Sequence, residues 1–592
     1  MQSSQNITKR VGTALQRIRS CLLCAISGKM SWLFLFFLLL SYTIAISGKF
    51  LHIPASWFFS LLFPVFDCYL LCLVVRCFSH VRLKFVGWLF ALLAAMLFFG
   101  ELFTLFYYRS FYSVYVIQLV LETDSHESRE FIGSALQYPA FWHTVLCFVV
   151  VAVVSYGLAR LSRKYLHHKT VLSWIVLVVI LFSGIRQCST YGKIYQTIVN
   201  PETALQNRMR SLNTTTVRIL YGIAFNNAQT ARLDNLQVSI EQATVDTCSF
   251  RSPLILLVIG ESYNKHHAHI YNPSYLQTTP RLEALQSSGN LTVLNDVVSP
   301  YNLTSEVFKN MFSLWDDSCD GDWTCYPLFP AIFKKAGYKV WFLTNQFTIG
   351  SLNYANIVGG TIFNSPQLSD LQFSYRNRSS YDYDLELCQE FPPLDTLAAG
   401  PALVIVHLMG QHVNYSGRYP AGYEHFQPNE EPTLFGGKKG KEIACQYDNA
   451  TYYNDMVVDS LFRTIKDAEC VGIYLSDHGE EAYDWRSLSG RTSEADMLPE
   501  VARYQYEIPF MFYTSDTYAA RHPDIVRQIR NAADRPAISS DLAHVLLYLG
   551  GINTPFYKER LNVLSPDYDM GRKRIIKGDT DYDLLMGLGQ GR

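Results

Sequence analysis

The sequence predicts an α/β protein with a transmembrane domain of five helices, followed by an extracytoplasmic α/β sandwich whose sheet is mainly parallel. Long apolar runs are confined to residues 31–187. After about residue 250, short apolar runs alternate with helical patterns, and the expected strands are 254–259, 340–343, 402–408, 471–475 and 508–513. Continuous apolar strands separated by helices are typical of a parallel sheet that is buried on both faces.

Five apolar runs in the first part are long enough to span a bilayer, which takes about 20 mostly apolar residues. They cover residues 31–48, 56–76, 85–107, 141–161 and 170–187. Because further spans follow the first run at once, we expect it to be a span and not a signal peptide. Asp67 lies within the second run, where an acidic side chain indicates either a function or a hydrogen bond to a neighbouring helix.

Positive charge predicts the orientation of these spans. Twelve Lys and Arg residues lie in the N-terminal tail and after spans 2 and 4, whereas the opposite loops hold three. Since cytoplasmic loops carry the excess of Lys and Arg, we expect the N-terminus to be cytoplasmic. The predicted organisation is a cytoplasmic tail (1–30), the membrane domain (31–187), a linker with helical segments (188–245) and an extracytoplasmic domain (246–592).

Charge and cysteine content restrict the partners and the compartment. The formal net charge is -1 and no basic tract is present, which argues against nucleic-acid binding. Cys319 and Cys325 flank a short polar loop, CDGDWTC. In an oxidising compartment this pair is a candidate disulfide, and the alternative is two unrelated thiols.

Polar side chains end two of the expected strands. Glu261 follows the apolar strand in LILLVIGES, and Asp477 and His478 follow the strand in VGIYLSDHGEE. Strand ends at one edge of a parallel sheet form binding sites. Carboxylate and imidazole ligands suit zinc, and an open fourth position is typical of a catalytic site. The alternatives are a turn before a helix for Glu261 and a structural histidine for His478.

The order of several motifs resembles the alkaline phosphatase/sulfatase superfamily and, more narrowly, the membrane-bound phosphoethanolamine transferases of Gram-negative bacteria. GES is followed by TTPRL (278–282), PYNLTSEVFKNMFS, HLMGQH and SDHGEE. The resemblance covers nearly the whole chain, including the five spans that precede one soluble domain. It implies one Zn²⁺ site and leaves a second metal open.

The resemblance also implies a nucleophile. In the family this is a Thr that begins a helix about 40 residues after the strand-end Glu, and Thr304 matches it. Metal coordination lowers the pKa of a hydroxyl, and a helix N-terminus suits a phosphoryl group. Thr304 would then be both a metal ligand and the nucleophile. The alternatives are a helix cap without chemistry and the neighbouring Ser305 as nucleophile.

Further catalytic and substrate-binding residues follow from the same resemblance. His407 and His412 in HLMGQH match a family motif whose histidines bind phosphate or transfer protons; a buried core histidine is the alternative for each. Glu127 is a candidate for binding the donor. Lys265 is a further candidate for substrate binding, because it lies just past Glu261 and not because of the resemblance. Glu127 lies in ETDSHE (122–127), which resembles the segment that faces the lipid donor in the family.

One departure from the family concerns the stretch after His478. Many members carry another histidine 10–15 residues after DHG, whereas residues 483–508 of this chain contain none. Arg486 or Arg491 is therefore the candidate for phosphate contact, and Arg491 is preferred.

The resemblance implies a two-step transfer of phosphoethanolamine from phosphatidylethanolamine to lipid A, a lipopolysaccharide core sugar or a periplasmic glycan. The expected protein is a multi-pass monomer of the bacterial inner membrane with its catalytic domain in the periplasm. The alternatives are a lipoteichoic-acid-synthase-like glycerol phosphate transferase and an inactive phosphatase-like membrane sensor. A plain sulfatase is disfavoured because the C/S-x-P-x-R context of a formylglycine precursor is absent.

Overall fold

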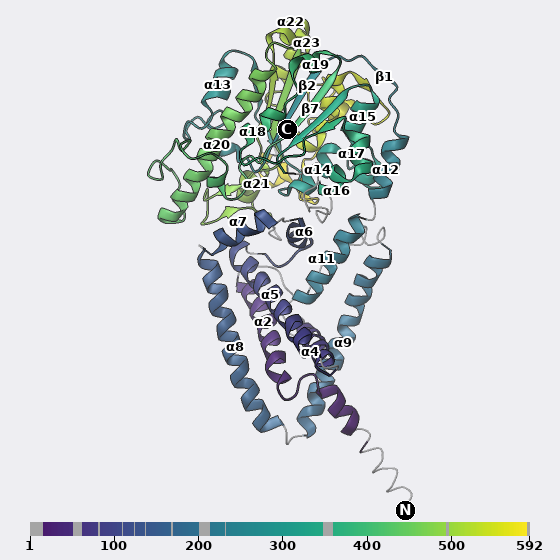
Figure 1. Ribbon diagram of the computed structural model, residues 1–592, viewed down its shortest axis with the longest axis vertical. Helices are drawn as coiled ribbons and strands as arrows, with labels where there is room; N and C mark the ends of the chain where they lie inside the picture. Colours follow the sequence, from purple (N-terminus) through teal and green to yellow (C-terminus); the bar gives the residue numbers. More distant parts are fainter. Residues whose placement is uncertain are drawn as a thin grey trace, which may run out of the picture. The chain divides into compact units, whose positions relative to one another are not determined.

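A computed structural model of the chain describes residues 13, 16–50, 62–80, 83–108, 110–122, 125–136, 138–166, 170–200, 213–230, 233–346, 359–492 and 497–588. They form two compact units (Figure 1). The first unit comprises residues 1–121, 132–229 and 492–495, and the second comprises residues 122–131, 230–491 and 496–592.

Long apolar helices build the first unit: α2 (Met30–Phe50), α4 (Phe63–His80), α5 (Lys84–Tyr108), α8 (Pro139–Leu166) and α9 (Thr170–Val199). Four stretches of the described residues are long and apolar enough to cross a membrane, namely Met30–Gly48, Lys84–Tyr108, Pro139–Ser162 and Ser173–Val199. Helix α4 is the described part of the second expected span, whose residues 56–61 lie outside the described residues. Large apolar side chains on α5, α8 and α9 are exposed, as expected for helices that face lipid.

Two buried acids hold the helices of this unit together. Asp67 of α4 accepts hydrogen bonds from Gln187 Nε2 at 3.1 Å, from Tyr191 Oη at 2.7 Å and from Thr214 Oγ1. Glu101 of α5 forms an ion pair with Arg218. The hydrogen-bonding interpretation of Asp67 is thus confirmed, since three donors from other segments surround its carboxylate.

The segment 188–245 is helical over most of its described length. Helix α9 continues to Val199, α11 covers Thr215–Thr230 and α12 covers Leu233–Gln242. Of these, α12 belongs to the second unit, where Leu236 and Ile240 are fully buried in the core.

A seven-stranded sheet organises the second unit, in the order β3-β11-β8-β2-β7-β5-β6. Its strands are β3 (Leu291–Leu294), β11 (Phe510–Thr514), β8 (Cys470–Ser476), β2 (Leu254–Gly260), β7 (Ala402–His407), β5 (Lys339–Thr344) and β6 (Tyr375–Arg376). Neighbouring strands from β8 to β6 are parallel, whereas β11 is antiparallel to both β8 and β3. The expectation of a mainly parallel sheet is confirmed.

Helices cover both faces of the sheet (Figure 1). Alternate residues of each strand point to opposite faces, so the apolar strands form one core on each face. On one face, Ile255, Leu257 and Ile259 pack into a core with helices α12, α14 (Thr304–Phe312), α15 (Phe329–Lys335) and α24 (Leu542–Gly550). On the other face, Leu254 and Leu256 pack against α13 (Pro280–Ser287) and α20 (Gly437–Thr464). The central strand β2 is buried along its whole length.

Helix α20 corrects one expectation. The sequence of the polar stretch 429–442 predicts a loop, followed by a helix that begins near Asn449, whereas α20 begins at Gly437. Glycine and lysine dominate its first turn, GKKGK, so neither apolar periodicity nor a side-chain cap marks the start. Gly436 precedes the helix in the left-handed conformation, with φ 74°.

The expected disulfide between Cys319 and Cys325 is not formed, and both residues are free thiols. Each thiol faces a different polar partner. The Cys319 sulfur accepts from Lys558 Nζ at 3.0 Å, whereas the Cys325 thiol lies 3.9 Å from Asp322 Oδ1. The two thiols therefore have separate polar neighbours in this structure.

A truncation in β2 tests the central position of this strand. We expect Leu257→Ala to lower the free energy of unfolding by about 2–5 kcal/mol, because a fully buried side chain is replaced by a cavity. The midpoint of thermal unfolding of the purified full chain measures the effect. The same change at Leu434, which is 90% exposed, should cost less than about 0.5 kcal/mol. Equal midpoints for the two variants would contradict the buried position of β2.

Candidate metal centre

The register of two neighbouring strands places the first two candidate ligands side by side. Strands β2 and β8 are parallel, and Gly260 pairs with Ser476 at their ends. Glu261 and Asp477 are the next residues, and the Asp477 backbone N–H donates to Gly260 O at 3.1 Å. Both carboxylates therefore leave the sheet at the same edge.

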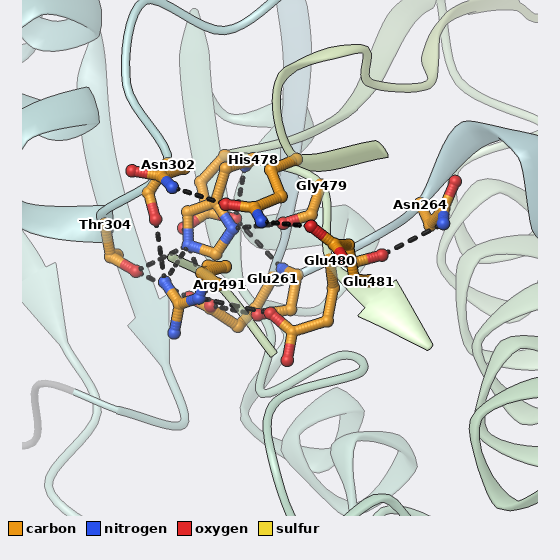
Figure 2. Close-up of polar contacts among 12 residues, drawn as sticks. Glu261, Asn264, Asn302, Thr304, His478, Gly479, Glu480, Glu481 and Arg491 are labelled. Carbon is orange, nitrogen blue, oxygen red and sulfur yellow. Dashed lines mark hydrogen bonds and ion pairs between the residues drawn. The ribbon is translucent and has the colours of Figure 1, made fainter. Parts of the chain in front are cut away.

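His478 completes a compact set of three potential metal ligands with Glu261 and Asp477. Its Nε2 lies 3.0 Å from Asp477 Oδ2 and 3.3 Å from Glu261 Oε1, and all three side chains are fully buried. One ligand atom from each residue lies within 4.8 Å of the others. Figure 2 shows Glu261 and His478 converging on this point.

This set fits a zinc ion. Around a tetrahedral zinc with bonds of about 2.0–2.2 Å, ligand atoms lie roughly 3.3 Å apart, close to the spacing found here. Asp477 Oδ2 is buried and accepts no hydrogen bond from the described residues. His478 Nδ1 lies 2.9 Å from Gly479 O, which fixes the proton on Nδ1 and leaves the lone pair of Nε2 for a metal.

The structure places Thr304 beside these three residues. It is the first residue of α14, and its Oγ1 donates to Glu261 Oε2 at 3.0 Å and lies 3.2 Å from His478 Nε2. The hydroxyl thus stands at a helix N-terminus, where backbone N–H groups and the helix dipole favour an anion.

Two residues that the sequence did not single out position the Glu261 carboxylate. Ser262 adopts φ 58°, and from there its N–H donates to Asp477 Oδ1 at 3.1 Å while its hydroxyl donates to Glu261 Oε1 at 2.8 Å. Gln346 Nε2 donates to Glu261 Oε2 at 3.2 Å. Gln346 follows β5, so the rule of polar residues at strand ends could have identified it.

Arg491 lies beside the ligands, whereas Arg486 does not. Arg491 Nη1 lies 2.6 Å from His478 Nε2 and donates to Asn302 O at 3.1 Å, and its Nε is 3.1 Å from Glu480 Oε2 (Figure 2). Arg486 pairs instead with the buried Glu481, at 2.6 Å. Of the two arginines expected near phosphate, the structure brings only Arg491 to the centre.

The buried charges of the centre shift one another's pKa. Burial opposes ionisation of Glu261, but the His478 ring and the Arg491 guanidinium lower its pKa well below the usual range. Burial and the Arg491 guanidinium lower the pKa of His478, but the Asp477 and Glu261 carboxylates raise it to about 9. A metal binds the neutral ring, so a metal bound at Nε2 would replace the proton that this raised pKa reflects.

The two histidines of HLMGQH occupy different surroundings. His407 is fully buried at the end of β7, with its Nδ1 3.2 Å from Thr344 Oγ1 and its ring 4.9 Å from that of Phe308. His412 is half-buried, and its Nδ1 is shielded from solvent and makes no hydrogen bond with the described residues. Burial lowers the pKa of His407 to about 4 and that of His412 to about 3, so both rings are neutral at pH 7. Their catalytic roles stay predictions.

Lys265 and Glu127, the other substrate-binding candidates, gain no support from the geometry. Lys265 Nζ forms an ion pair with Glu507 at 2.8 Å and donates to Asn295 O at 3.1 Å. These contacts give the buried Lys265 ammonium group its partners within the protein, so its position needs no substrate. The side chain of Glu127 lies outside the described part of the structure.

A mixed sheet with buried zinc-type ligands at its strand ends defines a metal-dependent α/β enzyme domain, and comparison with known proteins identifies the family. The sulfatase family pattern matches residues 253–552, and the chain belongs to this family. Phosphoethanolamine transferase EptC of Escherichia coli (strain K12) is 31% identical over 345 residues, which is 56% of this chain and 57% of that protein. Phosphoethanolamine transferase CptA of Salmonella typhimurium is 29% identical over the same shares. The chain thus matches less than two thirds of the length of these relatives.

A solved structure extends the likeness to the membrane helices. The integral membrane protein lipooligosaccharide phosphoethanolamine transferase A (EptA) from Neisseria meningitidis has a TM-score of 0.54 and 19% sequence identity. The match covers 90% of this chain and 97% of that chain. The two proteins therefore share a fold that joins apolar helices to a sulfatase-type domain, as the sequence predicted.

Gly410 gives a test of the ligand geometry. It adopts φ +50°, and a Cβ at this position would lie 2.7 Å from Glu261 O and 2.8 Å from Glu261 N. We expect Gly410→Ala to displace Glu261 and to weaken zinc binding by at least about tenfold in Kd, or ~1.4 kcal/mol. Gly400→Ala is the matched control, because nothing lies within 4 Å of its Cβ. Zinc titration of both variants measures the effect. Equal zinc affinities of the two variants would contradict the proposal that Gly410 keeps Glu261 in position.

Proposed function

We propose that the protein transfers phosphoethanolamine from phosphatidylethanolamine to a cell-envelope acceptor, with Zn²⁺ as cofactor and Thr304 as nucleophile. One observation carries the proposal: Thr304 Oγ1 lies at a helix N-terminus, 3.0 Å from Glu261 Oε2 and 3.2 Å from His478 Nε2. A hydroxyl within the ligand set of a metal is placed for activation as a nucleophile.

The residues of the chain supply distinct parts of this chemistry. Glu261, Asp477, His478 and Thr304 would hold the zinc, which when bound lowers the pKa of the Thr304 hydroxyl and stabilises negative charge on phosphate oxygens. Thr304 Oγ1 forms a bond to phosphorus while the bond from phosphorus to the diacylglycerol oxygen breaks. The proton of the hydroxyl is lost and the leaving oxygen gains one, so diacylglycerol departs and phosphoethanolamine stays on Thr304. In the second step, the oxygen of an acceptor hydroxyl forms a bond to phosphorus and loses its proton. The bond from phosphorus to Thr304 Oγ1 breaks, and Thr304 regains a proton.

Arg491 and the start of α14 would bind the anionic group. The guanidinium lies beside His478 and contacts Asn302 O, two residues before Thr304. Backbone N–H groups at the helix N-terminus supply further donors to phosphate oxygens. His412 is proposed to assist proton transfer, which is supported by its buried Nδ1 without a hydrogen-bond partner among the described residues.

The names of the relatives and the apolar helices support the choice of substrates and place. Both curated relatives are named phosphoethanolamine transferases, and four described helices are long and apolar enough to cross a membrane. We propose a multi-pass, monomeric protein of the inner membrane of a Gram-negative bacterium, with its catalytic domain in the periplasm. The acceptor is lipid A, the lipopolysaccharide core or a periplasmic glycan.

Labelled phosphatidylethanolamine tests the nucleophile directly. We expect the full-length protein in detergent to acquire a phosphoethanolamine group on Thr304, detected by mass spectrometry of its peptides. Thr304→Ala should lose the adduct and reduce transfer by at least about 10³-fold, since activity would rest on binding alone. Ser305→Ala should keep the adduct. A glycerol phosphate on Thr304 would favour the synthase-like alternative, and an adduct on Ser305 would refute the assignment of Thr304.

Zinc content tests the ligand set. We expect about one zinc per chain in the wild type, because the four ligands complete one tetrahedral site. His478→Ala should lower the zinc content to near zero, since it removes the only nitrogen ligand. His544→Ala is the control, because His544 is buried in α24 and its Nδ1 accepts from the Lys558 backbone, away from the ligands. Elemental analysis gives the metal-to-protein ratio, and zinc retained by His478→Ala would overturn the site.

A further inference from the structure

A buried carboxylate that is neither a metal ligand nor a substrate-binding candidate lies beside the HLMGQH segment. Asp384 is the first residue of α18 (Asp384–Leu387). Its Oδ1 accepts hydrogen bonds from the Met409 backbone N–H at 2.8 Å and from Asn345 Nδ2 at 3.0 Å. Its Oδ2 accepts from the Gly410 backbone N–H at 2.8 Å. The two oxygens of Asp384 thus bind donors from the segments that follow β5 and β7.

The segment after β7, which we call loop 408–412, packs directly on the metal ligand Glu261. Gly410 adopts φ +50°, and a Cβ at this position would lie 2.7 Å from Glu261 O. The next residue, Gln411, donates its backbone N–H to the same carbonyl oxygen at 3.0 Å. A shift of Gly410 would therefore move the backbone of Glu261, because the two backbones are in contact.

The segment after β5 reaches the carboxylate of the same ligand. Asn345, which donates to Asp384, is followed in the chain by Gln346. The side-chain amide of Gln346 donates to Glu261 Oε2 at 3.2 Å and to Leu408 O at 2.9 Å. Asp384 is therefore joined to Glu261 by two routes, one that ends at the backbone of the ligand and one that ends at its side chain.

We propose that Asp384 is a positioning residue for the metal centre. It holds loop 408–412 and the segment after β5 together, and through them it sets the position of Glu261. A carboxylate suits this role because it offers only acceptors, and three N–H donors converge on it. The role rests on the metal site of the proposed function and not on the identity of the transferred group.

Asp384→Asn changes these contacts while it keeps the size of the side chain. An amide has one oxygen and one NH2 group, so in either orientation the NH2 group faces the backbone N–H of Met409 or of Gly410. We expect the full-length variant, stripped of metal, to bind zinc at least about tenfold more weakly than the wild type, because Glu261 is no longer held in place. Titration with zinc against a chromophoric chelator measures the Kd without reference to activity.

Asp455→Asn is the matched control, because Asp455 makes the same kind of contacts elsewhere in the domain. It is fully buried in α20, and its carboxylate accepts from the backbone N–H groups of Arg281 at 3.1 Å and Leu282 at 2.9 Å. These bonds hold the start of α13. Both metal-free variants should melt at a lower temperature than the metal-free wild type. The zinc Kd of Asp455→Asn should nevertheless stay within about twofold of the wild-type value.

Asn345→Ala replaces Asp384→Asn if the latter fails to fold. It removes one donor to Asp384 and leaves the backbone N–H groups of Met409 and Gly410 on the carboxylate. We expect its zinc affinity to fall as well, but by less than that of Asp384→Asn.

The measurements separate this role from the proposed function. An unchanged zinc Kd of the variant would overturn the role of Asp384 and leave the proposed enzyme intact. The same holds if Asp384→Asn and Asp455→Asn weaken zinc binding equally, because the effect would then come from a general loss of stability. A wild type that binds no zinc would overturn the metal site itself, and the role of Asp384 with it.

Discussion

Register between β2 and β8 is the constraint on which the site depends. Gly260 and Ser476 are paired at the ends of two parallel strands, so the next residue of each strand leaves the sheet at the same level. A slip of one residue would turn one of the two carboxylates to the opposite face of the sheet. The apolar cores on both faces oppose such a slip, because alternate residues of β2 pack into the core on one face and the residues between them pack into the core on the other.

Burying the carboxylates of the centre costs free energy of folding unless a cation compensates their charge. Glu261 and Asp477 are both fully buried, and buried charges require compensation by opposite charge and hydrogen bonds. Ser262, Gln346 and Thr304 donate to the Glu261 carboxylate, but Asp477 Oδ2 accepts no hydrogen bond from the described residues. An arrangement of this kind is suited to holding a metal ion and not to stabilising the fold by itself.

The parts of the site that could be predicted from the sequence are those set by local pattern. Glu261, Asp477 and His478 interrupt apolar runs, and Thr304 begins a helical pattern at the spacing of a known family. The five strands were placed within two residues because each is a short apolar run. Local pattern could also mislead. Lys265 was proposed to bind substrate, because its ion pair with the distant Glu507 is not visible in the sequence.

Other features depend on tertiary contacts or on weak local signals. The contacts of Gln346 with Glu261, and of Arg491 with His478, join segments whose proximity only the folded sheet creates. The start of α20 at Gly437 was missed because glycine and lysine carry little helical pattern. The thiols of Cys319 and Cys325 show that closeness in the sequence does not determine contacts. Although the two residues are close in the chain, their sulfurs contact other side chains.

Ser262 and Asp477, which meet at the centre, are 215 residues apart in the chain. Contacts of such long range form late in folding, because the entropy of closing the intervening loop is lost before the contact is gained. A growing chain presents Glu261 and Thr304 well before the strand that carries Asp477 and His478 exists. The complete ligand set thus arises only in a chain whose central sheet is finished, so metal capture would come as a final step of maturation and would mark molecules that have folded correctly.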